Sequence, residues 1–117
     1  MEKDIEALMA AGLSENEAMT YLDLRSDGES QTGKICERTG IPSSRIYPVL
    51  GILLAKGLAS YKVVNNIKVF RASEPAALSQ LFEAREKTIR EEKERLLESI
   101  SKLKLIRPDE RMGDFRY

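Results

Sequence analysis

The side chains of this chain that can do chemistry are cations rather than nucleophiles. The sequence has no histidine and one cysteine, Cys36, so it cannot by itself assemble the usual zinc-ligand sets or a Ser–His or Cys–His pair. Cys36 follows Ile35, where a short helix should turn inward, and we interpret it as a buried small hydrophobe in preference to a reactive thiol. Adjacent acids, Glu91 and Glu92, lie in a charged stretch whose solvation explains them. The sequence therefore predicts no enzyme and no cofactor or metal.

Positive charge gathers between Gln31 and Ala72. Seven cations and the single anion Glu37 give this segment a net charge of +6, whereas the whole chain of 117 residues is neutral. Residues 1–30 hold eight acids against Lys3 and Arg25. A basic surface favours the phosphate backbone of DNA, because neutralising phosphates releases counterions and supplies most of the affinity. The seven cations are Lys34, Arg38, Arg45, Lys56, Lys62, Lys68 and Arg71.

Three consecutive polar residues, Ser43, Ser44 and Arg45, can read base edges if they open a helix that enters the major groove. Arg45 can offer two donors to guanine O6 and N7. A phosphate clamp without sequence choice is its alternative role. The two hydroxyls can bond bases or phosphates, and we expect the ring of Tyr47 to pack on the domain with its hydroxyl near a phosphate. Backbone contacts are also expected from the start of the preceding helix, at Gln31, Thr32 and Lys34.

A predicted β-hairpin supplies a second set of candidates. Lys62 and Lys68 flank Asn65 and Asn66, two residues that tolerate the positive φ angles of a tight turn. Since alternate residues of a strand share a face, Lys62 and the hairpin tip can reach the flanking minor groove or its phosphates. A hairpin that is merely solvated is the alternative interpretation.

Short helices must position these residues. Helical spacing of apolar residues predicts a first helix over 2–11 and a second over 15–25. Ser14 stands three residues before Glu17, the capping-box pattern, which fixes the start of the second helix. We expect the following Ser26-Asp27-Gly28 segment to be exposed.

A third helix is expected to be capped by Ser30 and to end at Gly40. A fourth should start at Ser44 or Arg45, with Ser44 as its cap, so that Pro48 falls in the first turn and costs little. A start at Ser43 would instead predict a kink. Runs over 58–64 and 67–71 then form the hairpin, so the order of elements predicts a winged helix-turn-helix.

The last predicted helix is long. It should be capped by Ser73 and run from Glu74 to about Lys104, some 31 residues, which exceeds what so small a domain can cover. Apolar residues recur along it every seven positions, which predicts a coiled-coil homodimer. A solvated, charge-laced helix is the alternative, because the middle of the seam is half polar. The predicted interface comprises Leu78, Phe82, Ile89, Leu96, Ile100 and Leu103.

The fold class that results is mainly α with a small β-hairpin, a winged helix-turn-helix followed by a long C-terminal coiled-coil helix. We predict a DNA-binding domain over 1–72, a dimerisation helix over 73–104, and a tail or the start of a linker over 105–117. No run approaches the length of an apolar membrane span, and the acidic N-terminus lacks the pattern of a signal peptide. The expected location is the cytoplasm, with no membrane partner.

Several motifs together resemble the TrmB-type winged-helix transcription regulators found mainly in archaea. They are GLSENEA followed by Tyr21, Gly40-Ile41-Pro42, Ser44-Arg45-Ile46-Tyr47, Lys56-Gly57-Leu58 and the exit Phe70-Arg71-Ala72 before Pro75, and they span about residues 8–80. The resemblance implies a DNA-binding homodimer that regulates transcription, with the long helix as its coiled coil. Pro48 stands where such proteins more often have a charged or polar residue. Longer members carry a sugar-binding effector domain for which this sequence is too short, so no small-molecule effector is assigned.

The function predicted from these observations is sequence-specific binding of double-stranded DNA by a homodimeric transcription regulator. A winged helix used for protein contacts, in a transcription or RNA-processing assembly, is the alternative. That alternative predicts an apolar patch on the side of the recognition helix and no salt-dependent affinity for DNA.

Overall fold

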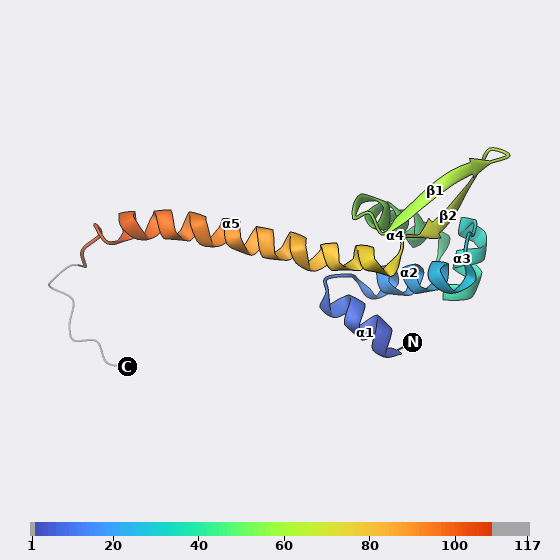
Figure 1. Cartoon of the computed structure of the whole chain (residues 1–117), viewed down its shortest axis with the longest axis horizontal. Helices are drawn as coiled ribbons and strands as arrows, with labels where there is room; N and C mark the ends of the chain where they lie inside the picture. The colour runs from blue at the N-terminus through green and yellow to red at the C-terminus, as the bar shows by residue number, and fades with distance from the viewer. Residues whose placement is uncertain (1, 109–117) are drawn as a thin grey trace. The chain divides into compact units, whose positions relative to one another are not determined.

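The protein is described by a computed structural model that covers residues 2–108. It divides into two compact units, Met1–Glu83 and Ala84–Tyr117. The first contains four helices and a hairpin (Figure 1): α1 (Glu2–Ala10), α2 (Glu15–Asp27), α3 (Thr32–Thr39), α4 (Ser43–Ala55), β1 (Ala59–Val64) and β2 (Ile67–Ala72). A 3₁₀ turn, η1 (Pro75–Leu78), precedes the long helix α5 (Ser79–Leu103), most of which belongs to the second unit. The predicted fold class, mainly α with a winged helix-turn-helix and a long C-terminal helix, is confirmed, and the pairing of that helix in a coiled coil stays a prediction.

Local capping chemistry fixes α2 as predicted. The backbone N–H of Glu17 donates to Ser14 Oγ at 3.1 Å, and the backbone N–H of Ser14 donates to Glu17 Oε1 at 3.3 Å. The helix continues two residues beyond the predicted end, to Asp27, and Gly28 then stops it with a φ of 80°. The capping box is therefore confirmed and only the C-terminal boundary differs.

Two other predicted caps are wrong, because tertiary contacts use the serine hydroxyls. Ser30 pairs its backbone with Phe70 of β2, and its Oγ accepts from Arg38 Nη2 at 2.6 Å, so Gln31 becomes the N-cap of α3. Ser73 Oγ donates to the carbonyl of Gly57 at 2.8 Å. The chain after Ser73 consequently enters the 3₁₀ turn, and α5 begins at Ser79 with 25 residues, about 37 Å.

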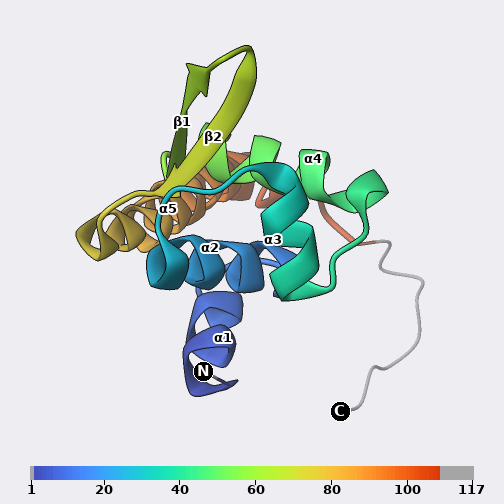
Figure 2. The same ribbon diagram turned by 90° about the vertical axis from the view of Figure 1, so that its right-hand side faces the viewer.

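The hairpin forms as the Asn-Asn turn predicts. Asn65 and Asn66 have φ values of 50° and 64°, which match the right-handed twist of the strands they join. The strands pair antiparallel from Ala59 opposite Ala72 to Val64 opposite Ile67. Figures 1 and 2 show the hairpin extending away from α2 and α3, so its tip is remote from the core.

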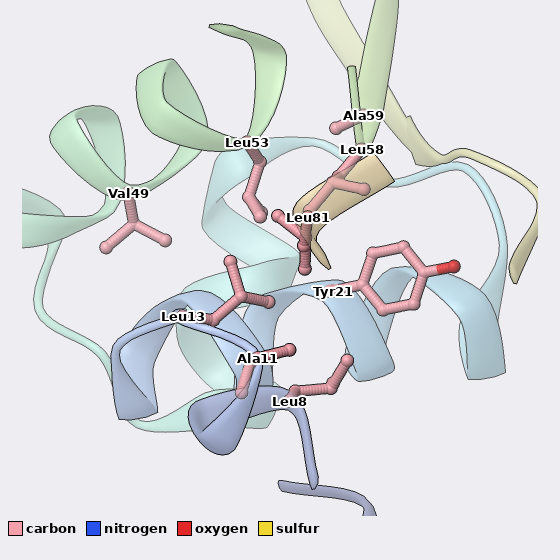
Figure 3. Packing of buried hydrophobic residues seen from close by; sticks show 10 residues of the cluster. Leu8, Ala11, Leu13, Tyr21, Val49, Leu53, Leu58, Ala59 and Leu81 are labelled. Carbon is pink, nitrogen blue, oxygen red and sulfur yellow. The ribbon is translucent and has the colours of Figure 1, made fainter. Parts of the chain in front are cut away.

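Two clusters of buried side chains hold the first unit together. One joins α1, α2 and α4 to the start of β1 and to Leu81 of α5, as Figure 3 shows. Tyr21 lies in this cluster, its hydroxyl donates to the carbonyl of Ser73 at 2.9 Å, and burial raises its pKa. The second cluster joins α2, α3, α4 and β2 through Leu24, Ile35, Ile41, Ile46, Leu50 and Phe70, with Cys36 half-buried against it.

No helix among the described residues is long and apolar enough to cross a membrane. The same part of the chain holds no group of three or more residues suited to a metal ion. The predicted tail or linker over 105–117 lies outside the described residues from position 109 onward.

Candidate nucleic-acid interface

The turn between α3 and α4 is built from local bonds and inward-facing isoleucines. Gly40 adopts the left-handed conformation with a φ of 77° and ends α3. Thr39 Oγ1 donates to the carbonyl of Ile35 at 2.7 Å and accepts from the N–H of Ile41 at 3.2 Å. Ile35 and Ile46 are fully buried in the second cluster, so the two helices are fixed to each other and present their other faces outward.

The predicted reading residues lie together in the first turn of α4. This helix begins at Ser43 with Pro42 as its N-cap, and the N–H groups of Arg45 and Ile46 donate to the carbonyl of Pro42 at 2.9 and 3.1 Å. The predicted cap at Ser44 is therefore wrong. Because no side chain caps α4, the hydroxyls of Ser43 and Ser44 are not used in this way, and both residues are exposed.

Pro48 is tolerated inside α4 although it falls later than predicted. It is the sixth helical residue, and its missing N–H deprives the carbonyl of Ser44 of the usual bond from four residues onward. The helix nevertheless continues as one element to Ala55. An exposed position lowers the cost, since water can satisfy the carbonyl.

Arg45 is exposed, and its side chain forms no ion pair, hydrogen bond or aromatic contact with the residues from 2 to 108. Lys68 and Arg71 also lack an ion pair there, but Lys68 lies over the ring of Tyr61 and Arg71 Nε donates to Ser60 Oγ at 3.2 Å.

Lys34 pairs with Glu37 at 3.6 Å, but both side chains are about two-thirds exposed, and such pairs contribute little. The other two candidates at the start of α3, Gln31 and Thr32, are exposed and half-buried respectively. The first N–H groups of α3 have no side-chain cap, so they remain available to an acceptor.

Acidic residues of α2 form ion pairs with two cations of the basic segment. Arg38 donates to Asp23 through Nε at 2.8 Å and through Nη2 at 2.9 Å, and its Nε lies 3.1 Å from Asp27 Oδ2. The bond to Asp23 raises the pKa of this guanidinium. Lys56 lies 3.8 Å from Glu17 Oε1. Two cations of the +6 segment thus serve the fold, a role that charge counting did not reveal.

The two lysines of the hairpin lie on opposite faces. Register places Lys62 opposite Val69 and Lys68 opposite Val63, and residues directly opposite share a face. Lys62 Nζ lies 3.0 Å from Glu29 Oε2, whereas Lys68 Nζ lies 4.8 Å above the ring of Tyr61. One DNA backbone lying along one face of the hairpin therefore cannot contact both lysines. The turn residues at the tip, Asn65 and Asn66, are exposed.

Tyr47 of α4 does not pack on the domain as expected. Its side chain is 62% exposed, so the domain does not cover the ring. Beyond Arg45 the exposed residues of α4 are apolar or small up to Ala55. This exposed apolar face of α4 could not be predicted from the sequence, because residues 46–55 form an almost continuous apolar run. In such a run, buried and exposed positions have the same type of side chain.

The predicted dimer residues fall into two groups. Leu78 belongs to η1 and packs against the first core cluster, so part of its surface is already covered. Ile100 is half-buried. Four residues at seven-residue spacing on α5 are between 51% and 60% exposed, namely Phe82, Ile89, Leu96 and Leu103.

Comparison with known proteins places these features in context. The model of the family described as "Sugar-specific transcriptional regulator TrmB" matches residues 8–76. A curated relative, the HTH-type sugar sensing transcriptional regulator TrmBL1 of Pyrococcus furiosus, is 38% identical over 56 residues. That match covers 48% of this chain and 16% of the relative.

Solved structures agree on the fold. TrmBL2, described as an archaeal chromatin protein with a novel mode of DNA binding, superposes with a TM-score of 0.77 at 24% identity, covering 87% of this chain and 40% of TrmBL2. A MarR-family regulator from Silicibacter pomeroyi gives a TM-score of 0.57 at 20% identity, over 90% of this chain and 80% of its own. This chain spans less than half the length of both TrmB-type relatives.

Proposed function

This chain belongs to the TrmB family of transcriptional regulators, and we propose that it binds double-stranded DNA sequence-specifically as a homodimer and so regulates transcription. One observation carries the proposal. Arg45 is exposed and forms no ion pair with the described part of the chain. It follows Ser43 and Ser44 in the first turn of α4, and the hydroxyls of these two serines do not cap the helix. Such a turn suits the edge of a base pair, because Arg45 can donate twice to a guanine.

Residues around this turn make the proposed backbone contacts. Gln31, Thr32 and Lys34 would meet phosphates through side chains and the first N–H groups of α3. Asn65 and Asn66 at the tip of the hairpin would reach the flanking minor groove, together with Lys68 or Lys62 according to the face that the backbone meets. Lys62 can contribute only after it leaves Glu29.

Homodimerisation is proposed through α5. Its exposed residues at seven-residue spacing are unfavourable in water, and a second copy of the helix would bury them. Two winged units would then act as one reader of a two-fold symmetric site.

The proposal includes no catalysis, since the family is one of regulators and not of enzymes. It places the protein in the cytoplasm, where an archaeal-type regulator meets its DNA. No small-molecule effector is assigned to it.

Fluorescence anisotropy of a labelled duplex across a salt series tests DNA binding. We expect tight binding at about 50 mM salt and a linear fall of log affinity with log salt, with a slope of about −0.9 for each phosphate contacted. Absence of binding to any duplex at low salt would contradict the proposal and favour the alternative role in protein contacts.

A further inference from the structure

The outward face of α4 beyond Arg45 is apolar. Positions 47, 48, 51, 52 and 55 recur at intervals of three and four residues, so they share one side of the helix. All five are exposed, with Tyr47 at 62% and Ile52 at 39%. The five residues, called the α4 face below, are Tyr47, Pro48, Gly51, Ile52 and Ala55.

Packing within the chain does not explain why this face is so small. Gly51 lies in mid-helix, where glycine is a poor helix former compared with alanine. A Cβ built on Gly51 would meet nothing within 4 Å apart from its chain neighbours and the adjacent backbone of its own helix, so the core does not demand glycine there. Glycine is instead suited to a place where another surface comes close to the backbone.

The α4 face continues the side of the helix on which the proposed reading turn lies. Ser44 precedes Tyr47 by three residues and Pro48 by four, and Arg45 is the neighbour of Ser44. A helix that lays its first turn in the major groove therefore brings this face toward the next base pairs. Between Arg45 and Lys56 the hydroxyl of Tyr47 is the one side-chain group of α4 able to form a hydrogen bond.

Thymine is the base whose major-groove edge carries an apolar group, the C5-methyl. This inference rests on the DNA-binding role proposed above. We propose that the α4 face contacts the C5-methyl groups of thymines, and so selects A·T pairs next to the base pairs that the first turn of α4 contacts. Ile52 supplies the apolar surface, and Gly51 permits the close approach. The α4 face is thus a specificity determinant that acts by shape and burial, without hydrogen bonds.

Methyl groups can be removed from DNA without changing its hydrogen-bonding edges. Affinity is measured for an alternating A·T duplex and for the same duplex with deoxyuridine in place of thymidine. We expect binding to weaken about fourfold for each thymine methyl that the α4 face buries, the factor that corresponds to burial of one CH₂ group. An alternating G·C duplex should gain affinity when its cytosines carry a 5-methyl group.

The outcomes separate this proposal from the broader one. Equal affinity for the thymidine and deoxyuridine duplexes would overturn the methyl contact and leave DNA binding intact. Failure to bind either duplex at low salt would overturn DNA binding itself.

Ile52→Ala tests the face directly. We expect the thymidine-to-deoxyuridine ratio of affinities to fall toward one, with the thermal midpoint little changed because Ile52 lies outside both core clusters. Met9→Ala on α1 is the matched control, since Met9 is 43% exposed and should leave the ratio unchanged. An unchanged ratio in Ile52→Ala would exclude the contact. A change in the DNA-free mass of Ile52→Ala would show that this face binds protein, which also overturns the proposal.

Gly51→Ala gives two readouts of opposite sign. The added methyl has room and favours the helix, so the thermal midpoint should rise. Affinity for the thymidine duplex should nevertheless fall several-fold, because the helix can no longer approach as closely. A more stable variant that binds as tightly as the unaltered protein would refute the close approach.

Discussion

Two helices of this protein expose apolar side chains, and they do so in different ways. On α5 the exposed residues are large, recur every seven positions and are interleaved with charged residues. On α4 the face is shorter, includes Gly51 and Ala55, and follows directly on the polar turn of Ser43, Ser44 and Arg45. A seven-residue period suits a second helix, whereas a small smooth face next to an unpaired arginine suits a groove. Exposed apolar surface therefore has to be interpreted by its spacing and its neighbours.

Leu96→Asp should have the largest effect, because it places a charge in the apolar stripe of α5 through which we propose that two copies pair. A buried, unpaired carboxylate would prevent pairing, so the mass by light scattering should fall from twice 13.2 kDa to 13.2 kDa. Affinity for a two-fold symmetric duplex should drop by about 10² or more, since the second half-site no longer binds intramolecularly. Half-site binding through α4 should survive.

Thr88→Asp is the control for that variant. Thr88 is exposed on α5 and lies off the seven-residue stripe, and the change in charge is the same. A dimer should persist. If Leu96→Asp also stays dimeric, the α5 stripe is not the interface.

Arg45→Ala removes the proposed base contact of α4 and should leave the mass measured by light scattering unchanged. If Arg45 donates twice to a guanine, its loss should cost about 1–3 kcal/mol and relax the preference at one base position. The measurement is anisotropy with a panel of duplexes that differ at single positions. A uniform loss across all sequences would instead identify a phosphate contact.

Arg38→Ala should lower the stability of the unit that carries α4 without changing the mass measured by light scattering. It leaves the buried Asp23 carboxylate without its guanidinium, which should cost about 2 kcal/mol and lower the thermal midpoint by roughly 10 °C. Lys34→Ala, which removes only an exposed pair, is the stability control. Equal midpoints for the two variants would show that the Asp23 pair contributes little.

Glu29→Gln should produce the smallest effect. Glu29 belongs neither to the α5 stripe nor to the α4 face, so this variant tests whether the hairpin also contributes to DNA binding. It releases Lys62, which now lies 3.0 Å from Glu29, so DNA affinity should rise by up to about fivefold. The salt dependence should steepen by about one phosphate contact if Lys62 then reaches the backbone. No change in either quantity would mean that this face of the hairpin stays away from DNA.

How far the sequence could predict the structure depended on how local each interaction was. The Ser14–Glu17 box and the Asn65-Asn66 turn involve neighbours in sequence, and both formed as predicted. The caps at Ser30 and Ser73 were wrong because Arg38 and the carbonyl of Gly57 compete for those hydroxyls, and neither partner could be known before the chain was folded.

The candidate interface shows the same division. The start of α4 was predicted to within one or two residues, but the cap at Ser44 was wrong, because the helix begins at Ser43 with Pro42 as its N-cap. The pairing of Arg38 with Asp23, and of Lys62 with Glu29, joins residues from different elements and reduced the usable charge. The α4 face was hidden because an apolar run does not reveal which of its residues face water.

Selection of bound duplexes from a random DNA pool tests the central claim most directly. We expect enrichment of an inverted repeat, because the two-fold symmetry of a dimer is imprinted on its site, with A·T pairs beside the positions that Arg45 meets. Recovery of no enriched sequence, at salt concentrations where the protein binds DNA, would contradict sequence-specific recognition by a dimer.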